Sequence, residues 1–116
     1  MAQVQLGYFT IDTLDIAKAR AFYGALFGWT FDEASSHPTY AHVADSDPAF
    51  GFVKVEVKKD FPHLYFRVDD IDAMCARVND LGGKAAVPSD TQSGRSAVVC
   101  DDQGVSFSLW QPAAGL

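Results

Sequence analysis

Aromatic, hydroxyl and basic side chains alternate along two short apolar runs, and they are the residues best suited to hold a small molecule. Tyr8 and Thr10 belong to the first run; His63, Tyr65 and Arg67 belong to the second. In a strand, alternate residues point to the same face, so each set would share one surface. Aromatic rings supply contact area, hydroxyl and imidazole groups supply directed hydrogen bonds, and a guanidinium can clamp a carboxylate or phosphate. This pattern predicts a surface suited to a flat organic ligand.

Each of these residues also has a purely structural explanation. Phe, Tyr and Trp are regularly buried in small domains, so any single aromatic is more readily core than ligand contact. Arg67 can form a surface ion pair with Asp69 or Asp12, which would contribute little stability. His63 follows Pro62 and can simply finish a turn. As a group on one strand face, the aromatics favour a binding surface.

The elements that position these residues follow from an internal repeat. Tyr8-Phe9-Thr10-Ile11-Asp12 and Tyr65-Phe66-Arg67-Val68-Asp69 share an apolar run with an acidic end, and each leads into a segment with helical spacing. The residues that would face the core are Ala19, Phe22, Tyr23 and Leu26 in the first helix and Ile71, Met74, Cys75, Val78 and Leu81 in the second. Gly28 and Gly82-Gly83 would end the helices, and Asp69-Asp70 is interpreted as the second N-cap. The alternative is a chance likeness between two ordinary αβ segments.

Strand-like runs follow each predicted helix, separated by turn-forming residues. They are residues 29–33, 40–44 and 50–57 in the first half and 85–87, 96–100 and 106–111 in the second, with a turn at 88–94. Each half is therefore predicted to be a βαβββ module, which alone would have too little core to be stable. The sequence predicts an α+β chain of two tandem modules, residues 1–57 and 58–116, in a single domain spanning 1–116.

Composition narrows the range of partners. The 116 residues carry a formal net charge of −6, and the pI is about 4.7, which disfavours nucleic acids and anionic membrane surfaces. No apolar run approaches the roughly 20 residues that cross a bilayer, and residues 1–5 lack a signal-peptide pattern, so a cytoplasmic location is expected. Cys75 and Cys100 have no C-x-x-C spacing and are predicted to be free, mostly buried thiols. No P-loop, dinucleotide or nucleophile-elbow motif is present.

The chain resembles a known superfamily. Ala19-x-x-Phe22-Tyr23-Gly24-Ala25-Leu26-Phe27-Gly28-Trp29 resembles the first-helix motif of glyoxalase/bleomycin resistance/dioxygenase proteins, the vicinal oxygen chelate (VOC) superfamily. Residues 63–73, 81–83 and 101–112 are similar to its second module, with Asp102 standing where the superfamily commonly has Pro. The resemblance implies a curved eight-stranded mixed sheet around a cleft, with one helix outside each half.

Strand alternation selects the residues that would face such a cleft. Phe9, Ile11, Phe66 and Val68 would cover the helices, so the opposite parity would point inward. The predicted ligand-binding residues are Leu6, Tyr8, Thr10, Phe50, Phe52, His63, Tyr65, Arg67, Ser108 and Trp110.

Metal-dependent members of the superfamily hold one divalent ion with four inward side chains. The resemblance places these positions on Leu6 or Tyr8, on the Phe50-Gly51-Phe52 strand, on His63 and on Ser108. Only His63 is a competent ligand, whereas catalytic metals normally keep at least three protein donors. No cofactor is expected, and His63 is the one metal candidate if a divalent ion does bind. His37 and His42 are interpreted as structural or solvent-facing.

Three functions compete. The leading hypothesis is a metal-independent protein that binds or sequesters an aromatic or amphipathic ligand, as antibiotic-binding members of the superfamily do. The first alternative is a divalent-metal-dependent lyase, isomerase or dioxygenase that retains His63. The second is an accessory interaction module whose cleft is vestigial and filled by Phe50 and Phe52. The resemblance also implies a homodimer.

Overall fold

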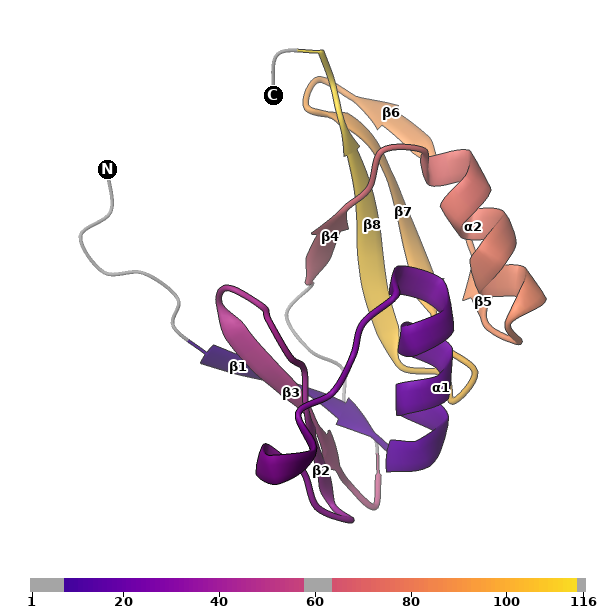
Figure 1. Ribbon diagram of the computed structural model, residues 1–116. Helices are drawn as coiled ribbons and strands as arrows, with labels where there is room; N and C mark the ends of the chain where they lie inside the picture. Colours follow the sequence, from indigo (N-terminus) through magenta and orange to yellow (C-terminus); the bar gives the residue numbers. More distant parts are fainter. Residues whose placement is uncertain (1–7, 58–63, 115–116) are drawn as a thin grey trace. The chain divides into compact units, whose positions relative to one another are not determined.

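Two compact units make up the chain, divided between Lys58 and Lys59, and each combines strands with one α-helix (Figure 1). The computed structural model describes residues 8–57 and 64–114. These residues form two α-helices and eight strands in mixed, unclosed sheets, which confirms the predicted α+β class. Neither helix is long and apolar enough to cross a membrane.

The first unit is a three-stranded sheet with one α-helix. Its elements are β1 (Tyr8–Thr13), α1 (Ile16–Phe27), the short 3₁₀-helix η1 (Glu33–Ser35), β2 (Tyr40–His42) and β3 (Ala49–Lys54). The strand order is β1-β3-β2, with β1 parallel and β2 antiparallel to β3. Helix α1 begins where the Asp15 carboxylate accepts the Lys18 N–H, and it ends at Gly28, whose φ of 74° is left-handed. The predicted glycine stop is confirmed.

Aromatic rings fill the core of the first unit. The α1 residues predicted to face inward, Ala19, Phe22, Tyr23 and Leu26, are all buried. The ring of Tyr23 lies 4.8 Å from that of Phe52 on β3, and Trp29 lies 4.9 Å from Phe50. These contacts attach α1 and the segment after it to one face of the sheet.

The second unit has a larger sheet and its own helix. Its elements are β4 (Tyr65–Arg67), α2 (Ile71–Asp80), β5 (Lys84–Ala85), β6 (Ser89–Thr91), β7 (Gly94–Cys100) and β8 (Ser106–Pro112). The strand order is β4-β8-β7-β5, and β6 also pairs with β7. The Asp70 carboxylate accepts the Ala73 N–H, which confirms the predicted N-cap of α2. The side-chain carbonyl of Gln111 on β8 accepts the Ile71 N–H at 2.8 Å, so the last strand also holds the start of the helix.

Apolar residues of β4, β7 and β8 form the core of the second unit against α2. Ile71, Cys75 and Val78 are buried as predicted, while Met74 and Leu81 are half-buried. On the sheet, the rings of Phe66 and Phe107 meet edge to face at 5.7 Å, and Leu109 is fully buried between the strands.

Two local predictions were wrong. Residues 29–33 form only an isolated bridge, Phe31 to Val43, because the Asp32 carboxylate accepts the Ala34 N–H and turns the chain into η1. Residues 88–94, predicted as a turn, contain β6, a short strand that pairs with the start of β7. In both units the first and last strands are parallel neighbours, as β1–β3 and β4–β8.

Candidate ligand-binding surfaces

Strand register decides which side chains of the first unit share a face. Phe9 pairs with Phe50 and Ile11 pairs with Phe52, whereas Thr10 pairs with Gly51. Paired residues of neighbouring strands point to the same side of a sheet. The four apolar residues therefore face α1, and Tyr8 and Thr10 lie on the opposite, open face.

Phe50 and Phe52, predicted to line the ligand site, do not share the open face with Tyr8 and Thr10. Phe50 is 5% exposed and Phe52 is fully buried, and both pack against rings of α1 and the segment that follows it. The sequence indicated that β3 was a strand but contained no signal for its register with β1. A shift of one residue in the strand register moves each side chain from the core face of the sheet to the open face.

Three polar aromatic side chains are hydrogen-bonded in a chain on the open face of the first unit. The Tyr8 and Tyr40 hydroxyl oxygens lie 2.6 Å apart, and the Tyr40 hydroxyl lies 2.7 Å from Nδ1 of His42. The Tyr8 and His42 rings are nearly parallel, with centroids 6.5 Å apart. Tyr8 is 47% exposed, while Tyr40 and His42 are half-buried, so Tyr8 is the solvent-exposed end of this chain of hydrogen bonds.

The bare backbone of Gly51 makes room for this hydrogen-bonded chain. A Cβ at Gly51 would lie 2.6 Å from the Tyr40 hydroxyl oxygen and 2.7 Å from the Ala41 carbonyl oxygen. The Tyr40 phenol thus lies directly over β3. This burial, together with the hydrogen bond between the Tyr40 and Tyr8 hydroxyls, raises the pKa of Tyr40 to about 12, so its hydroxyl keeps its proton at physiological pH.

The open face of the second unit carries four of the predicted residues. Tyr65 pairs with Ser108 and Arg67 with Trp110, on the side of the sheet opposite the Phe66–Leu109 pair that faces α2. The Arg67 guanidinium carbon lies 6.0 Å from the Trp110 ring centroid, a cation–π distance. Trp110 Nε1 donates to the Ser93 carbonyl at 3.2 Å, which fixes the indole. Tyr65 is 60% exposed, whereas Ser108 is buried.

A hollow of about 290 Å³ adjoins Arg67 at this end of the sheet. Its lining consists of residues at the ends of β4 and β8 and beyond, namely Arg67, Val68, Asp69, Gln111, Pro112, Ala113 and Ala114. A guanidinium beside a hollow of this kind can meet an anionic group of a ligand whose rings lie on the sheet face.

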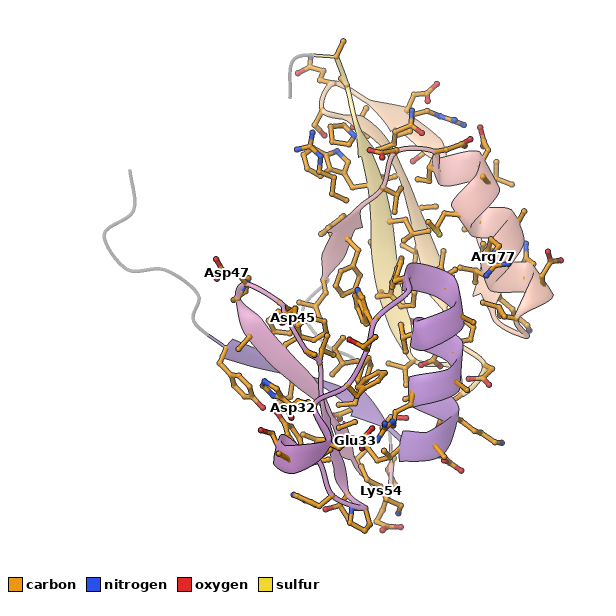
Figure 2. All side chains as sticks on the ribbon, viewed as in Figure 1. Asp32, Glu33, Asp45, Asp47, Lys54 and Arg77 are labelled. Carbon is orange, nitrogen blue, oxygen red and sulfur yellow. The ribbon has the colours of Figure 1, made fainter. Side chains whose placement is uncertain are left out.

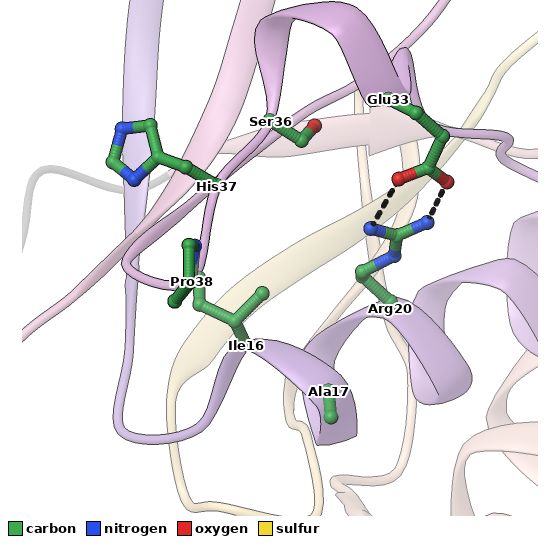
Figure 3. A pocket seen from close by; sticks show the side chains of 7 residues that line it. All are labelled: Ile16, Ala17, Arg20, Glu33, Ser36, His37 and Pro38. Carbon is green, nitrogen blue, oxygen red and sulfur yellow. Dashed lines mark hydrogen bonds and ion pairs between the residues drawn. The ribbon is translucent and has the colours of Figure 1, made fainter.

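A second hollow, of about 550 Å³, lies in the first unit between the start of α1 and residues 33–38 (Figure 3). The Arg20 guanidinium and the Glu33 carboxylate form a bidentate ion pair at its edge, and Arg20 also lies over the Phe31 ring. The pair raises the pKa of Arg20 and lowers that of Glu33. Because these two charges engage each other, they are better explained as a tie between α1 and η1 than as ligand groups.

The described residues do not fit a divalent metal. Their His, Cys, Asp and Glu side chains form no group of three that could hold an ion. Of the positions implied by the resemblance, Tyr8 offers a phenol bonded to Tyr40, Phe50 and Phe52 offer no donor atom, and Ser108 offers a hydroxyl. Neutral hydroxyls are poor substitutes for imidazole, thiolate and carboxylate ligands.

Leu6 and His63 lie outside the described residues, so their predicted roles stay predictions.

Tyr40 and His42 were missed as candidate site residues, although the sequence contained a signal for them. They alternate about Ala41, which is fully buried, and this parity places both on the open face. What the sequence lacked was the strand order that brings β2 near Tyr8.

Comparisons with known proteins agree with this architecture. A family model described as a glyoxalase-like domain matches residues 8–110. The chain is 37% identical over 102 residues to "Putative glyoxylase CFP32" of Mycobacterium tuberculosis and 27% identical over 125 residues to "Anthracycline biosynthesis protein DnrV" of Streptomyces peucetius. These alignments cover 82% and 90% of this chain but only 39% and 46% of the relatives, so the chain spans less than half of their length.

Solved structures share the fold over nearly the whole chain. TnmS3, an antibiotic-binding protein from Streptomyces sp. CB03234, is 30% identical with a TM-score of 0.70, over 97% of this chain and 99% of that one. A glyoxalase/bleomycin resistance protein/dioxygenase family enzyme from Burkholderia phytofirmans PsJN has a TM-score of 0.79 at 23% identity, over 95% and 100% of the two chains. The repeat, the two helix–sheet units and the family match lead to one conclusion: this chain belongs to the glyoxalase-like domain family of the VOC superfamily.

Proposed function

We propose that this protein binds a flat aromatic or amphipathic small molecule without a metal ion. The observation that carries the proposal is the open sheet face of each unit, which presents aromatic rings with hydrogen-bonding edges. The open face of the first unit carries Tyr8 and Tyr40. The open face of the second unit carries Tyr65, Arg67 and Trp110. Rings with a few fixed polar groups are the usual composition of small-molecule sites.

The donor chemistry supports metal independence. Lyases, isomerases and dioxygenases that use a divalent ion need ligands that stabilise it, and the described part of the chain offers hydroxyls or no donor atom at the corresponding positions. His63, outside that part, is one ligand at most. The proposal therefore ranks binding ahead of metal-assisted catalysis and ahead of an accessory interaction module.

The relatives support the ligand class. One is named as an antibiotic-binding protein and another as an anthracycline biosynthesis protein. Anthracyclines are polycyclic aromatic molecules, and such molecules suit a surface rich in Tyr and Trp. A cytoplasmic location and a homodimer remain predictions.

Tryptophan fluorescence can test the proposal because the two indoles have different surroundings. Trp110 lies on the open face of the second unit, whereas Trp29 packs among the rings of the first core. Titration with an anthracycline, bleomycin and anthraquinone-2-sulfonate, each with and without EDTA, is expected to give saturable quenching with at least one probe. The quenching should persist in Trp29→Phe and be lost in Trp110→Phe. Stoichiometric bound metal by elemental analysis, or quenching abolished by EDTA, would count against metal independence.

The role of Arg67 can be tested with a charge-matched control. Arg67→Gln should weaken binding of anthraquinone-2-sulfonate roughly tenfold, because a charge-assisted hydrogen bond to the anion is lost. Arg77→Gln removes the same charge from helix α2 (Figure 2) and should leave binding unchanged. Isothermal titration calorimetry of both variants gives the comparison. If both variants bind the probe equally weakly, the effect of Arg67 is one of overall charge and not of a direct contact.

A further inference from the structure

We propose that the Tyr8 hydroxyl is a contact site for an oxygen atom of the bound aromatic ligand, and that Tyr40 and His42 set whether this contact donates or accepts a hydrogen bond. This inference rests on the proposed function and adds a chemical selectivity to it. It starts from the hydrogen-bonded chain of Tyr8, Tyr40 and His42, with separations of 2.6 and 2.7 Å.

Whether Nδ1 of His42 carries a proton determines whether the Tyr8 hydroxyl donates or accepts a hydrogen bond at the exposed end of the hydrogen-bonded chain. A hydroxyl has one proton, so each tyrosine can donate only one hydrogen bond. If Nδ1 of His42 carries no proton, Tyr40 must donate to it. Tyr8 must then donate to Tyr40, and the Tyr8 oxygen is left only as an acceptor for a ligand. In this state the site takes a hydroxyl or amine group.

If Nδ1 carries the proton, every bond in the chain reverses. His42 donates to the Tyr40 oxygen, Tyr40 donates to the Tyr8 oxygen, and the Tyr8 proton points to the ligand. In this state the site takes a carbonyl oxygen. A neutral imidazole reaches it when Nε2 gives its proton to water and Nδ1 takes one up, so no net charge develops.

The surroundings hold the chain together but leave its end accessible. Tyr40 lies over Gly51, where no side chain separates it from the strand, and its hydroxyl, whose pKa is raised to about 12, stays protonated and bonded to both neighbours. Tyr8 is 47% exposed on the open face. A half-buried relay with an exposed end can therefore adapt to a ligand without moving any heavy atom.

The ligand class that this geometry favours is a polycyclic aromatic with a carbonyl or hydroxyl at its edge, such as a quinone or its hydroxylated form. Ring contact alone would not distinguish such a molecule from its hydrocarbon parent. The Tyr8 contact would distinguish them, because only the oxygenated molecule completes the hydrogen-bonded chain.

A matched probe pair tests the inference. Anthraquinone-2-sulfonate and anthracene-2-sulfonate share the anionic group and ring system and differ in the two carbonyl oxygens. In the wild-type chain at about pH 8, where histidine is ordinarily neutral, the quinone should bind roughly three- to tenfold more tightly, as one neutral hydrogen bond allows. The preference should vanish in Tyr8→Phe, which keeps the ring.

The tautomer of His42 supplies a readout that a structural role would not change. Nitrogen-15 shifts of the imidazole should move toward the Nδ1–H form when the quinone binds and stay unchanged with the anthracene. Tyr40→Phe should abolish this response, and His37, whose Nδ1 lies near Thr39, should not respond in any sample.

The outcomes separate the two proposals. If both probes bind equally in wild type and in Tyr8→Phe, or if His42 keeps a bare Nδ1 in the quinone complex, the inference is wrong and the proposed function stands. If neither probe binds up to millimolar concentration, both proposals are overturned. The wild-type tautomer measurement requires no variant and is decisive even if Tyr40→Phe does not fold.

Discussion

Gly51 is a small residue on which a large part of the first unit's open face depends. Its Cα hydrogen faces the Tyr40 phenol, and an added methyl group would meet both the phenol and the Ala41 carbonyl. The absence of a side chain therefore positions the three polar aromatics around it.

Gly51→Ala is expected to displace Tyr40 and to lower the free energy of unfolding by about 1–3 kcal/mol, the usual cost of overpacking. Urea denaturation measures the loss. Gly24→Ala is the control, since its Cβ would lie 3.4 Å from the Trp29 carbonyl oxygen in a helix interior, where alanine is favoured over glycine. Equal stability of the two variants would contradict the contact geometry.

The two cysteines lie in different environments. Burial raises the pKa of the Cys75 thiol in α2, and the nearby Asp72 charge adds to the effect. Cys100 is less buried and lies 3.5 Å from the Ser106 hydroxyl. The thiolate is the reactive form, so Cys100 should react first with a disulfide reagent. Cys100→Ser should remove the fast phase of labelling, and a fast phase that survives would place the reactive thiol at Cys75.

At the scale of elements, β8 does more than complete a sheet. Its Gln111 side chain accepts the first N–H of α2, so a strand near the C-terminus caps a helix forty residues earlier. Such a bond satisfies an amide that the helix itself leaves without a partner.

Gln111→Ala should lower the free energy of unfolding by about 1 kcal/mol, because the Ile71 N–H loses its acceptor. Gln111→Glu keeps an oxygen there and places negative charge at the helix start, so it should retain most of the stability. Thermal unfolding of the two variants tests the difference. Identical losses would show that an acceptor oxygen at this position is not what stabilises the start of α2.

The two helices and most of the strands were predictable from the sequence, and the pairing of the strands was not. The helix faces, the Gly28 stop and the Asp70 cap depend on local spacing, and all three are confirmed. The face of Phe50 and Phe52 depends on the register of β3 against β1, which is a contact between distant residues. The same gap explains why Tyr40 and His42 were missed, since their partner Tyr8 lies on a strand 32 residues away.

At the scale of the whole molecule, one exposed ion pair in each unit links a helix to its surroundings. Arg20 with Glu33 joins α1 to η1, and Arg95 with Asp72 joins β7 to α2, with Asp90 adding a further bond to Arg95. The arginines hold the pKa values of Glu33 and Asp72 below their ordinary range. Both carboxylates are therefore more acidic in the folded state than in the unfolded chain.

The sign of the resulting pH dependence follows from linkage. Stability from these pairs is fully present above the ordinary carboxyl pKa of about 4 and is lost as pH falls through the lower folded values. Glu33→Gln and Asp72→Asn should each flatten the decline of unfolding free energy below about pH 4, with only small changes at pH 7. Urea titrations across pH provide the measurement, and about 1 M NaCl should mask the effect by screening. If the unfolding free energy declines in both variants as it does in the wild type, the decline is due to other carboxylates.

The parallel pairing of first and last strands within each unit also determines where this polypeptide tolerates interruption. Every strand ladder of the described residues joins partners from the same unit, β1 with β3 and β4 with β8 among them, and none spans residues 57–64. A backbone cut there would sever no ladder. Each half can thus be made as a separate fragment that keeps all its own strand pairings, so one half can be labelled or altered without touching the other.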